Sequence, residues 1–196
     1  MRSVFTLSIL IPAAIVLSGC STAPSSVAKR DLLHERSQGV IVRFKSKDAS
    51  ISKFFDTASG YAVFPTVGKG AIWIGGAYGR GELYEKGVMV GYCDLSQATI
   101  GLQLGGQAYS EVIFFENDVS LHDFKANNFA FSANASAVAA NVGASTTADY
   151  EDGVLVFTRT KGGLMFEASI GGQKFSYEAK SSSSGSHEPQ VSQVIQ

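Results

Sequence analysis

The chain has 196 residues, a formal net charge of −1 at pH 7 and 45% hydrophobic residues. A charge this close to zero argues against a general nucleic-acid-binding protein, which requires a concentrated basic surface. The length and the hydrophobic share suit one globular domain with a sizeable core.

The first nineteen residues have the pattern of a bacterial lipoprotein signal peptide. Arg2 supplies a positive charge, and the run from Val4 to Val16 is mostly apolar. This run fits a secretory segment and is shorter than the roughly 20 apolar residues that a bilayer-spanning helix needs. It leads into Leu17-Ser18-Gly19-Cys20, which resembles a lipobox. We therefore predict cleavage between Gly19 and Cys20 and lipidation of Cys20. An ordinary secretory signal or a buried helix is the alternative.

Lipidation predicts a chain that is tethered to a membrane without crossing it. A diacylglyceryl group on the Cys20 thiol and a third chain, such as palmitate, on its amine would give stable anchoring, which a single acyl chain does not. Ser21 stands where lipoproteins of the inner membrane tend to have Asp. The expected location is therefore the outer membrane, with the folded part facing the periplasm.

The mature chain is expected to begin with helices. After a short flexible spacer at 21–26, apolar residues recur at helical spacing from Val27 to about Phe44, although Gly39 weakens the middle of this helix. Asp48 is placed to cap a second short helix that continues through Ser59.

From Gly60 onward the apolar period changes to two, which predicts half-buried antiparallel strands. Paired glycines such as Gly75-Gly76 indicate bulges or bends in a curved sheet. A short helix capped by Asp118 fits residues 119–126. The expected strands lie near 61–66, 70–78, 87–93, 98–105, 108–115, 129–142, 153–159, 163–170 and 174–178. The predicted fold class is α+β, with a strongly curved antiparallel sheet or a barrel packed against N-terminal helices.

The sequence divides into four expected segments with an uneven distribution of charge. These are a signal peptide at 1–19, a lipidated N-terminus and spacer at 20–27, a folded domain at 28–179 and a disordered Ser-rich tail at 180–196. Residues 21–60 hold seven basic and four acidic side chains, whereas residues 61–196 hold eight and thirteen. A basic segment beside a lipid anchor can face anionic headgroups, and a solvated helix face explains it equally well.

Several motifs in the strand region resemble those of the SYLF domain family. The later ones are Gly101-Leu102-Gln103-Leu104-Gly105-Gly106-Gln107, the apolar run from Val112 to Phe115 and the Ala-rich segment from Ser132 to Val138. The opening ones are Gly60-Tyr61-Ala62-Val63-Phe64-Pro65, Val67-Gly68-Lys69-Gly70, Gly75-Gly76 and Gly79-Arg80-Gly81. Together they place the resemblance over roughly residues 28–178.

The resemblance implies a lipid-interacting function. Eukaryotic SYLF domains bind phosphoinositide-containing membranes, and fungal members also bind actin filaments. The membrane contact of the family is attributed to an N-terminal amphipathic helix with basic residues, and the matching region here is 27–53. Anionic headgroups other than phosphoinositides are the expected ligand in a bacterium, and actin binding carries over poorly to a periplasmic protein. The candidate lipid-binding residues are Lys29, Arg30, Arg36, Arg43, Lys45 and Lys47.

No catalytic or metal-binding constellation is evident in the sequence. His34, His122 and His187 have no metal-ligand spacing to other donors. Gly68-Lys69-Gly70 lacks the rest of a P-loop, so we expect Gly68 and Gly70 to form backbone turns. Cys93, the one cysteine besides Cys20, lies in an apolar run that predicts a buried core residue. We expect neither an enzyme nor a cofactor, metal or nucleic acid. The alternative function is a structural lipoprotein that binds an envelope protein partner; an unrecognised hydrolase is a third hypothesis.

Overall fold

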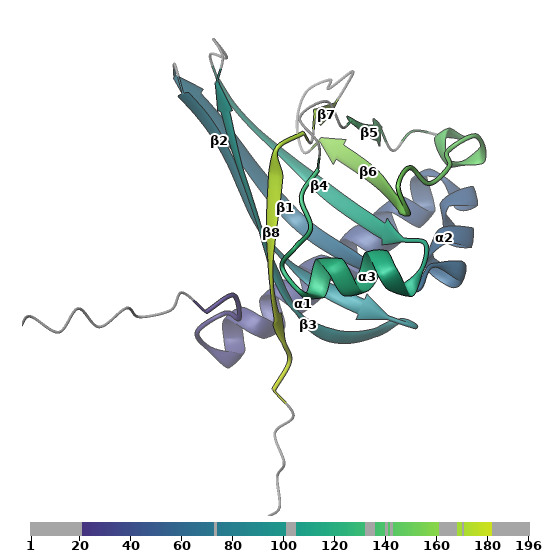
Figure 1. Ribbon diagram of the computed structural model, residues 1–196, viewed down its shortest axis with the longest axis horizontal. Coiled ribbons are helices and arrows are strands. Elements are labelled where there is room, and N and C mark those ends of the chain that lie inside the picture. Colours follow the sequence, from purple (N-terminus) through teal and green to yellow (C-terminus); the bar gives the residue numbers. More distant parts are fainter. Residues whose placement is uncertain are drawn as a thin grey trace, which may run out of the picture.

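The computed structural model describes residues 21–72, 74–100, 105–131, 136–139, 141, 143–160, 168–169 and 171–181 (Figure 1). The predicted signal peptide, the cleavage site at Gly19 and the lipidation site at Cys20 lie outside the described residues. So does the Ser-rich tail from residue 182 onward. Within the described residues, no helix combines the length and apolarity that crossing a bilayer requires.

The helices form largely where the sequence predicts them. Helix α1 (Val27–Lys47) begins after Ser26, whose side chain accepts a hydrogen bond from the backbone N–H of Lys29. The short 3-10 helix η1 (Ala49–Ile51) and helix α2 (Ser52–Thr57) follow, and Asp48 caps η1 as predicted. Helix α3 (Asp118–Lys125) is capped by Asn117 rather than by Asp118. The predicted cap was therefore one residue too late.

The strands are longer and fewer at the start of the sheet than the sequence suggests. The predicted strands at 61–66 and 70–78 are not separated by a turn at Gly68-Lys69-Gly70, because β1 continues through it with a register shift between Val63 and Thr66. In the same way, β3 joins two expected strands. Within the expected strand at 129–142 the structure describes β5, and residues 132–135, 140 and 142 lie outside the described residues. The strands are β1 (Gly60–Ile72), β2 (Ile74–Glu85), β3 (Val88–Ile100), β4 (Gly105–Phe115), β5 (Ser136–Ala139), β6 (Val154–Thr160), β7 (Ala168–Ser169) and β8 (Gln173–Ala179).

The strands form one open, mixed sheet, which corrects part of the predicted fold class. The order is β7-β5-β6-β4-β1-β2-β3-β8, and β5 runs parallel to β6. Parallel neighbours require a long connection, which here runs through the 3-10 helix η2 (Ala144–Thr146). The fold is α+β as predicted, but the sheet is neither closed into a barrel nor strongly curled, and its strands are not all antiparallel.

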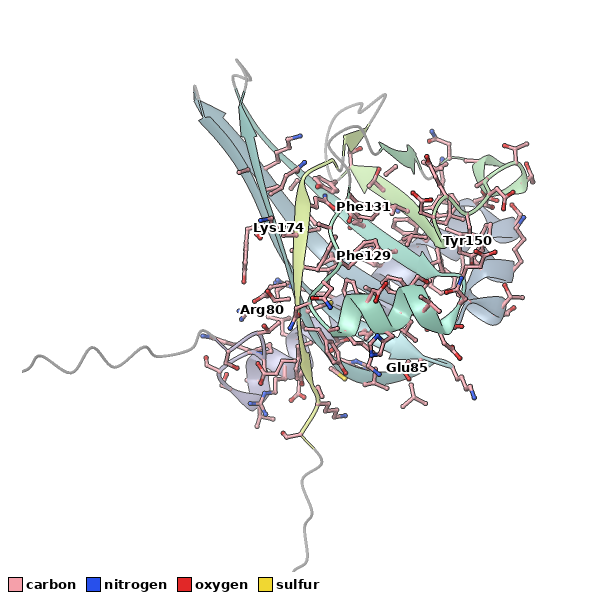
Figure 2. All side chains as sticks on the ribbon, viewed as in Figure 1. Arg80, Glu85, Phe129, Phe131, Tyr150 and Lys174 are labelled. Atoms are coloured by element: carbon pink, nitrogen blue, oxygen red, sulfur yellow. The ribbon has the colours of Figure 1, made fainter. Side chains whose placement is uncertain are left out.

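Each face of the sheet carries its own hydrophobic core. On one face, α1, η1 and α2 pack through Phe44, Ile51 and Phe54 onto Tyr61 and Phe114. The opposite face is covered by α3 and by segment 127–131, and Phe129 and Phe131 lie over it in Figure 2. Figure 1 shows α1 and α2 behind the sheet and α3 in front. We call the two layers the α1 layer and the α3 layer.

Candidate functional site

Four of the six predicted lipid-binding residues lie along one exposed flank of α1. Lys29, Arg36 and Arg43 are spaced by seven residues, which brings side chains of a helix back to nearly the same direction. Lys47 follows one turn after Arg43, and all four side chains are exposed. Among the described residues, none of the four forms an ion pair. We call these four residues the basic row.

The other two predicted residues have different surroundings. The Nε of Arg30 donates to the backbone oxygen of Pro24 at 2.9 Å, so Arg30 holds the segment before the helix. The Nζ of Lys45 lies 4.8 Å from the centroid of the Phe55 ring, in a cation–π contact. Both side chains therefore have a structural role as well as a charge, and the structure does not bring them together with the basic row.

A shallow hollow of about 420 Å³ adjoins the C-terminal part of the basic row. Arg43 lines it from α1, and Arg159 lines it from β6. Arg159 faces this layer because it follows the buried Phe157 by two positions on the strand and is paired in register with Ser110 of β4. The Ser110 hydroxyl donates to the Pro65 backbone oxygen at 2.9 Å. Two guanidinium groups beside one hollow suit an oxyanion such as a phosphate.

The sequence did not single out Arg159. It lies far from the N-terminal basic segment and forms no unusual motif with its neighbours. The two-residue period of a strand could only have placed it on the same sheet face as Phe157. Only the packing of α1 onto the sheet brings Arg43 to the same hollow as Arg159.

A second cleft of about 370 Å³ lies at the N-terminal half of α1 and contains His34 and Glu82. The Nδ1 of His34 is 3.1 Å from an oxygen of Glu82, and the Tyr84 hydroxyl donates to the same oxygen. Burial, followed by this hydrogen bond, raises the pKa of Tyr84 far above its ordinary value. Gln38 donates to the Tyr84 hydroxyl at 3.0 Å. This network attaches α1 to β2 through side chains that already satisfy one another.

Residues 21–26, which follow the predicted lipidation site, are part of the fold, in contrast to the flexible spacer expected there. Thr22 is only 6% exposed, and Pro24 is also buried. Ser21 and Ala23 both donate to the carboxylate of Glu178 on β8. The predicted lipidation site is therefore bonded directly to a residue that is docked on the sheet.

The α3 side of the sheet holds a buried polar cluster that the sequence did not reveal. Glu111 of β4 is 0% exposed, and the Gln173 side chain donates to its carboxylate at 3.2 Å. Gln173 also donates to the Tyr109 hydroxyl at 3.2 Å. Burial outweighs the hydrogen bond from Gln173 and raises the pKa of Glu111 to about 8. One Glu111 carboxyl oxygen has no hydrogen-bond partner. The cluster lines neither of the two hollows described above.

Metal binding and thiol chemistry find no support in the part of the chain that the structure describes. In that part, no three His, Cys, Asp or Glu residues are grouped to hold a metal ion. Cys93 is fully buried, as predicted, and its burial raises the pKa of its thiol well above the ordinary value. A thiol that is neutral and shielded from solvent is a poor nucleophile.

The sequence of this chain matches one known protein family and one relative over part of its length. Residues 96–187 match the family Ysc84, described as "Las17-binding protein actin regulator", which is the SYLF family. The chain is 27% identical over 136 residues to "Beta cell expansion factor A" of Aeromonas veronii, a SYLF protein. The alignment covers 69% of this chain and 52% of the relative, so the chain spans about half of that protein's length. The family match includes Gly101–Gln107 and the two later motifs that resemble the family and begins after the motifs at 60–81. The resemblance of the chain to the SYLF family is therefore confirmed over residues 96–187.

Proposed function

We propose that this protein is an envelope lipoprotein whose SYLF-type domain binds anionic lipid headgroups at the α1 layer. The basic row is the observation that carries the proposal. Its four side chains are exposed, and none forms an ion pair with an acidic residue among the described residues. Arg159 adds a further positive charge beside Arg43. In this proposal Cys20 anchors the chain to the outer membrane, and the domain faces the periplasm without catalysing a reaction.

The charges are sufficient for a modest, salt-sensitive interaction. A basic residue at an anionic membrane surface contributes about 1 kcal/mol, so the basic row would contribute on the order of 4 kcal/mol at most. This attraction decays over about 10 Å at 0.1 M ionic strength. The acidic Asp31 and Glu35 on the outward side of α1 reduce it. Such binding would reinforce an acyl anchor rather than replace it.

Liposome co-sedimentation of the unlipidated domain, starting at Ser21, tests the proposal. Vesicles of phosphatidylcholine alone are compared with vesicles that also contain phosphatidylglycerol, each at low and high salt. The test variant carries Arg36→Gln and Arg43→Gln. The matched control carries Lys69→Gln and Lys86→Gln, which remove the same charge from the α3 side of β1 and from the turn between β2 and β3.

We expect binding to the anionic vesicles at low salt, a clear loss in the test variant and little change in the control. An equal loss in both variants would mean that net charge alone drives binding. Absence of binding to every vesicle would overturn headgroup recognition. The protein would then fit the alternative function, a non-enzymatic lipoprotein that binds an envelope protein partner.

A further inference from the structure

The start of the mature chain is fastened to the sheet by one carboxylate. The Ser21 hydroxyl donates to Glu178 Oε2 at 2.8 Å, and the Ala23 backbone N–H donates to the same oxygen at 3.0 Å. These hydrogen bonds to the ionised form lower the pKa of Glu178, so it is charged at neutral pH. We call residues 21–26 together with Glu178 the clamp.

The clamp is continuous with the first turn of α1. Arg30 donates to the Pro24 backbone oxygen, and the Ser26 side chain caps the helix. The Lys29 Nζ lies 3.4 Å from the Ser25 hydroxyl. Because hydrogen bonds hold the segment along its length, it should not act as a flexible linker between the lipidation site and the folded domain.

The clamp lies on the same side of the sheet as α1. Glu82, Tyr92 and Glu178 are aligned in register across β2, β3 and β8, so their side chains share one face. Glu82 contacts His34 of α1, which identifies this face as the one covered by the α1 layer. Glu178 is therefore bound to Ser21 within the α1 layer, on the side of the sheet opposite α3.

We propose that the clamp orients the anchored protein, holding the α1 layer against the bilayer that receives the acyl chains of Cys20 and directing the α3 layer away from it. The proposal rests on the lipid anchor of the proposed function. Consecutive Cα atoms are about 3.8 Å apart, so Cys20 cannot be far from Ser21. The α1 layer presents the basic row along one flank of α1 and the exposed Val27 and Val42 on other exposed sides of the same helix. Both features suit a headgroup region better than open solvent.

The test uses the mature, lipidated protein in phosphatidylcholine–phosphatidylglycerol vesicles that contain a lipid-borne quencher. A fluorophore is attached to a single introduced cysteine at Val27, Val42 or Val119, three exposed valines. Val27 and Val42 belong to α1, whereas Val119 belongs to α3. The native thiol of Cys93 is buried and does not compete for the label. We expect quenching several-fold stronger at Val27 and Val42 than at Val119.

Releasing the clamp should remove this difference. In Glu178→Ala the quenching at the three positions should converge. Glu151→Ala removes an exposed carboxylate whose side chain forms no hydrogen bond or ion pair within the described residues, and it should leave the difference in quenching unchanged. Equal quenching at all three positions in the native sequence, or a difference that survives Glu178→Ala, overturns the proposal.

Amide hydrogen exchange of the protein in detergent distinguishes a failure of the clamp from a failure of the lipid anchor. The Ala23 amide should exchange slowly in the native sequence and rapidly in Glu178→Ala. Rapid exchange in both overturns the clamp whatever the membrane result. If the Ala23 amide exchanges slowly but the protein does not remain bound to vesicles, the clamp is intact and the proposed lipid anchor is refuted.

Discussion

Asp48 and Ser145 join two parts of the chain that lie 97 positions apart. Both the backbone N–H and the hydroxyl of Ser145 donate to Asp48 Oδ2, at 2.9 and 2.7 Å. The other Asp48 oxygen accepts from the backbone N–H and hydroxyl of Ser50. One buried carboxylate therefore caps η1 and fastens η2, which lies on the connection between the parallel strands β5 and β6.

Replacing Asp48 by Ala should destabilise the protein by about 3 kcal/mol, because several buried donors lose their acceptor at once. Ser50→Ala removes one donor and should cost about 1 kcal/mol. Chemical denaturation with both variants measures the difference. An equal effect of the two substitutions would contradict the role of Asp48 as the shared acceptor.

Asp48 also predicts a loss of stability in acid. Burial alone would raise its pKa, but the hydrogen bonds from Ser50 and Ser145 outweigh burial and hold the pKa well below its ordinary value of 3.8. A depressed pKa in the folded state contributes stability that is present above the unfolded pKa and is lost as the pH falls below it. Asp48→Asn should therefore flatten the fall in unfolding free energy below about pH 4.

Glu111 predicts the opposite pH dependence. Its folded pKa of about 8 lies above the ordinary value of 4.5, so the folded state binds more protons than the unfolded state between these values. Stability should fall by up to about 1.4 kcal/mol per pH unit as the pH rises through this window. Glu111→Gln should remove this slope, whereas Glu116→Gln, at an exposed position, should retain it. Parallel slopes in the two variants, measured by denaturation across the window, would contradict the prediction.

Gly39→Ala should stabilise the protein by about 1 kcal/mol, because glycine is unfavourable inside a helix. An added Cβ would meet Arg43 Nη1 at 3.2 Å, and this atom ends a flexible side chain that can move aside. Thermal denaturation measures the gain. A loss of stability would mean that Arg43 is held more firmly in place than its exposure suggests.

Arg159→Gln should weaken binding to anionic vesicles although it lies outside the N-terminal basic segment. Loss of one charge at the surface corresponds to about 1 kcal/mol, or roughly fivefold in affinity. Unfolding free energy should change by less than about 0.5 kcal/mol. Lys69→Gln, on the α3 side of β1, is the control of equal charge. If both variants bind equally well, the hollow between Arg43 and Arg159 is not a headgroup site.

The sequence was informative where local periodicity determines structure. Val27 as the start of α1, Asp48 as a cap and Cys93 as a core residue follow from spacing, capping chemistry and apolar neighbours, and the structure confirms all three. The turn expected at Gly68-Lys69-Gly70 was wrong because glycine tolerates extended backbone as well as turns, and the pairing of β1 with β2 and β4 decides between them.

Contacts between distant segments could not be predicted in the same way. Arg159 and Arg43 line one hollow, Gln173 bonds to Glu111, and Glu178 bonds to Ser21. These contacts form only after the strands have taken their order and register. The parallel pairing of β5 with β6 likewise depends on where the chain passes after α3. Such features arise from tertiary packing, which leaves no periodic signal in a single sequence.

The two halves of α1 are held by different kinds of contact, and this predicts a gradient of local stability along one helix. The second half buries Val40, Ile41 and Phe44 in the core, whereas the first half is held mainly through His34 and Gln38. Segments with few buried apolar contacts open at lower free energy than the whole domain. We therefore expect amide hydrogen exchange to be faster in the first half of α1 than in the second half, while the clamp keeps the segment before the helix attached to β8.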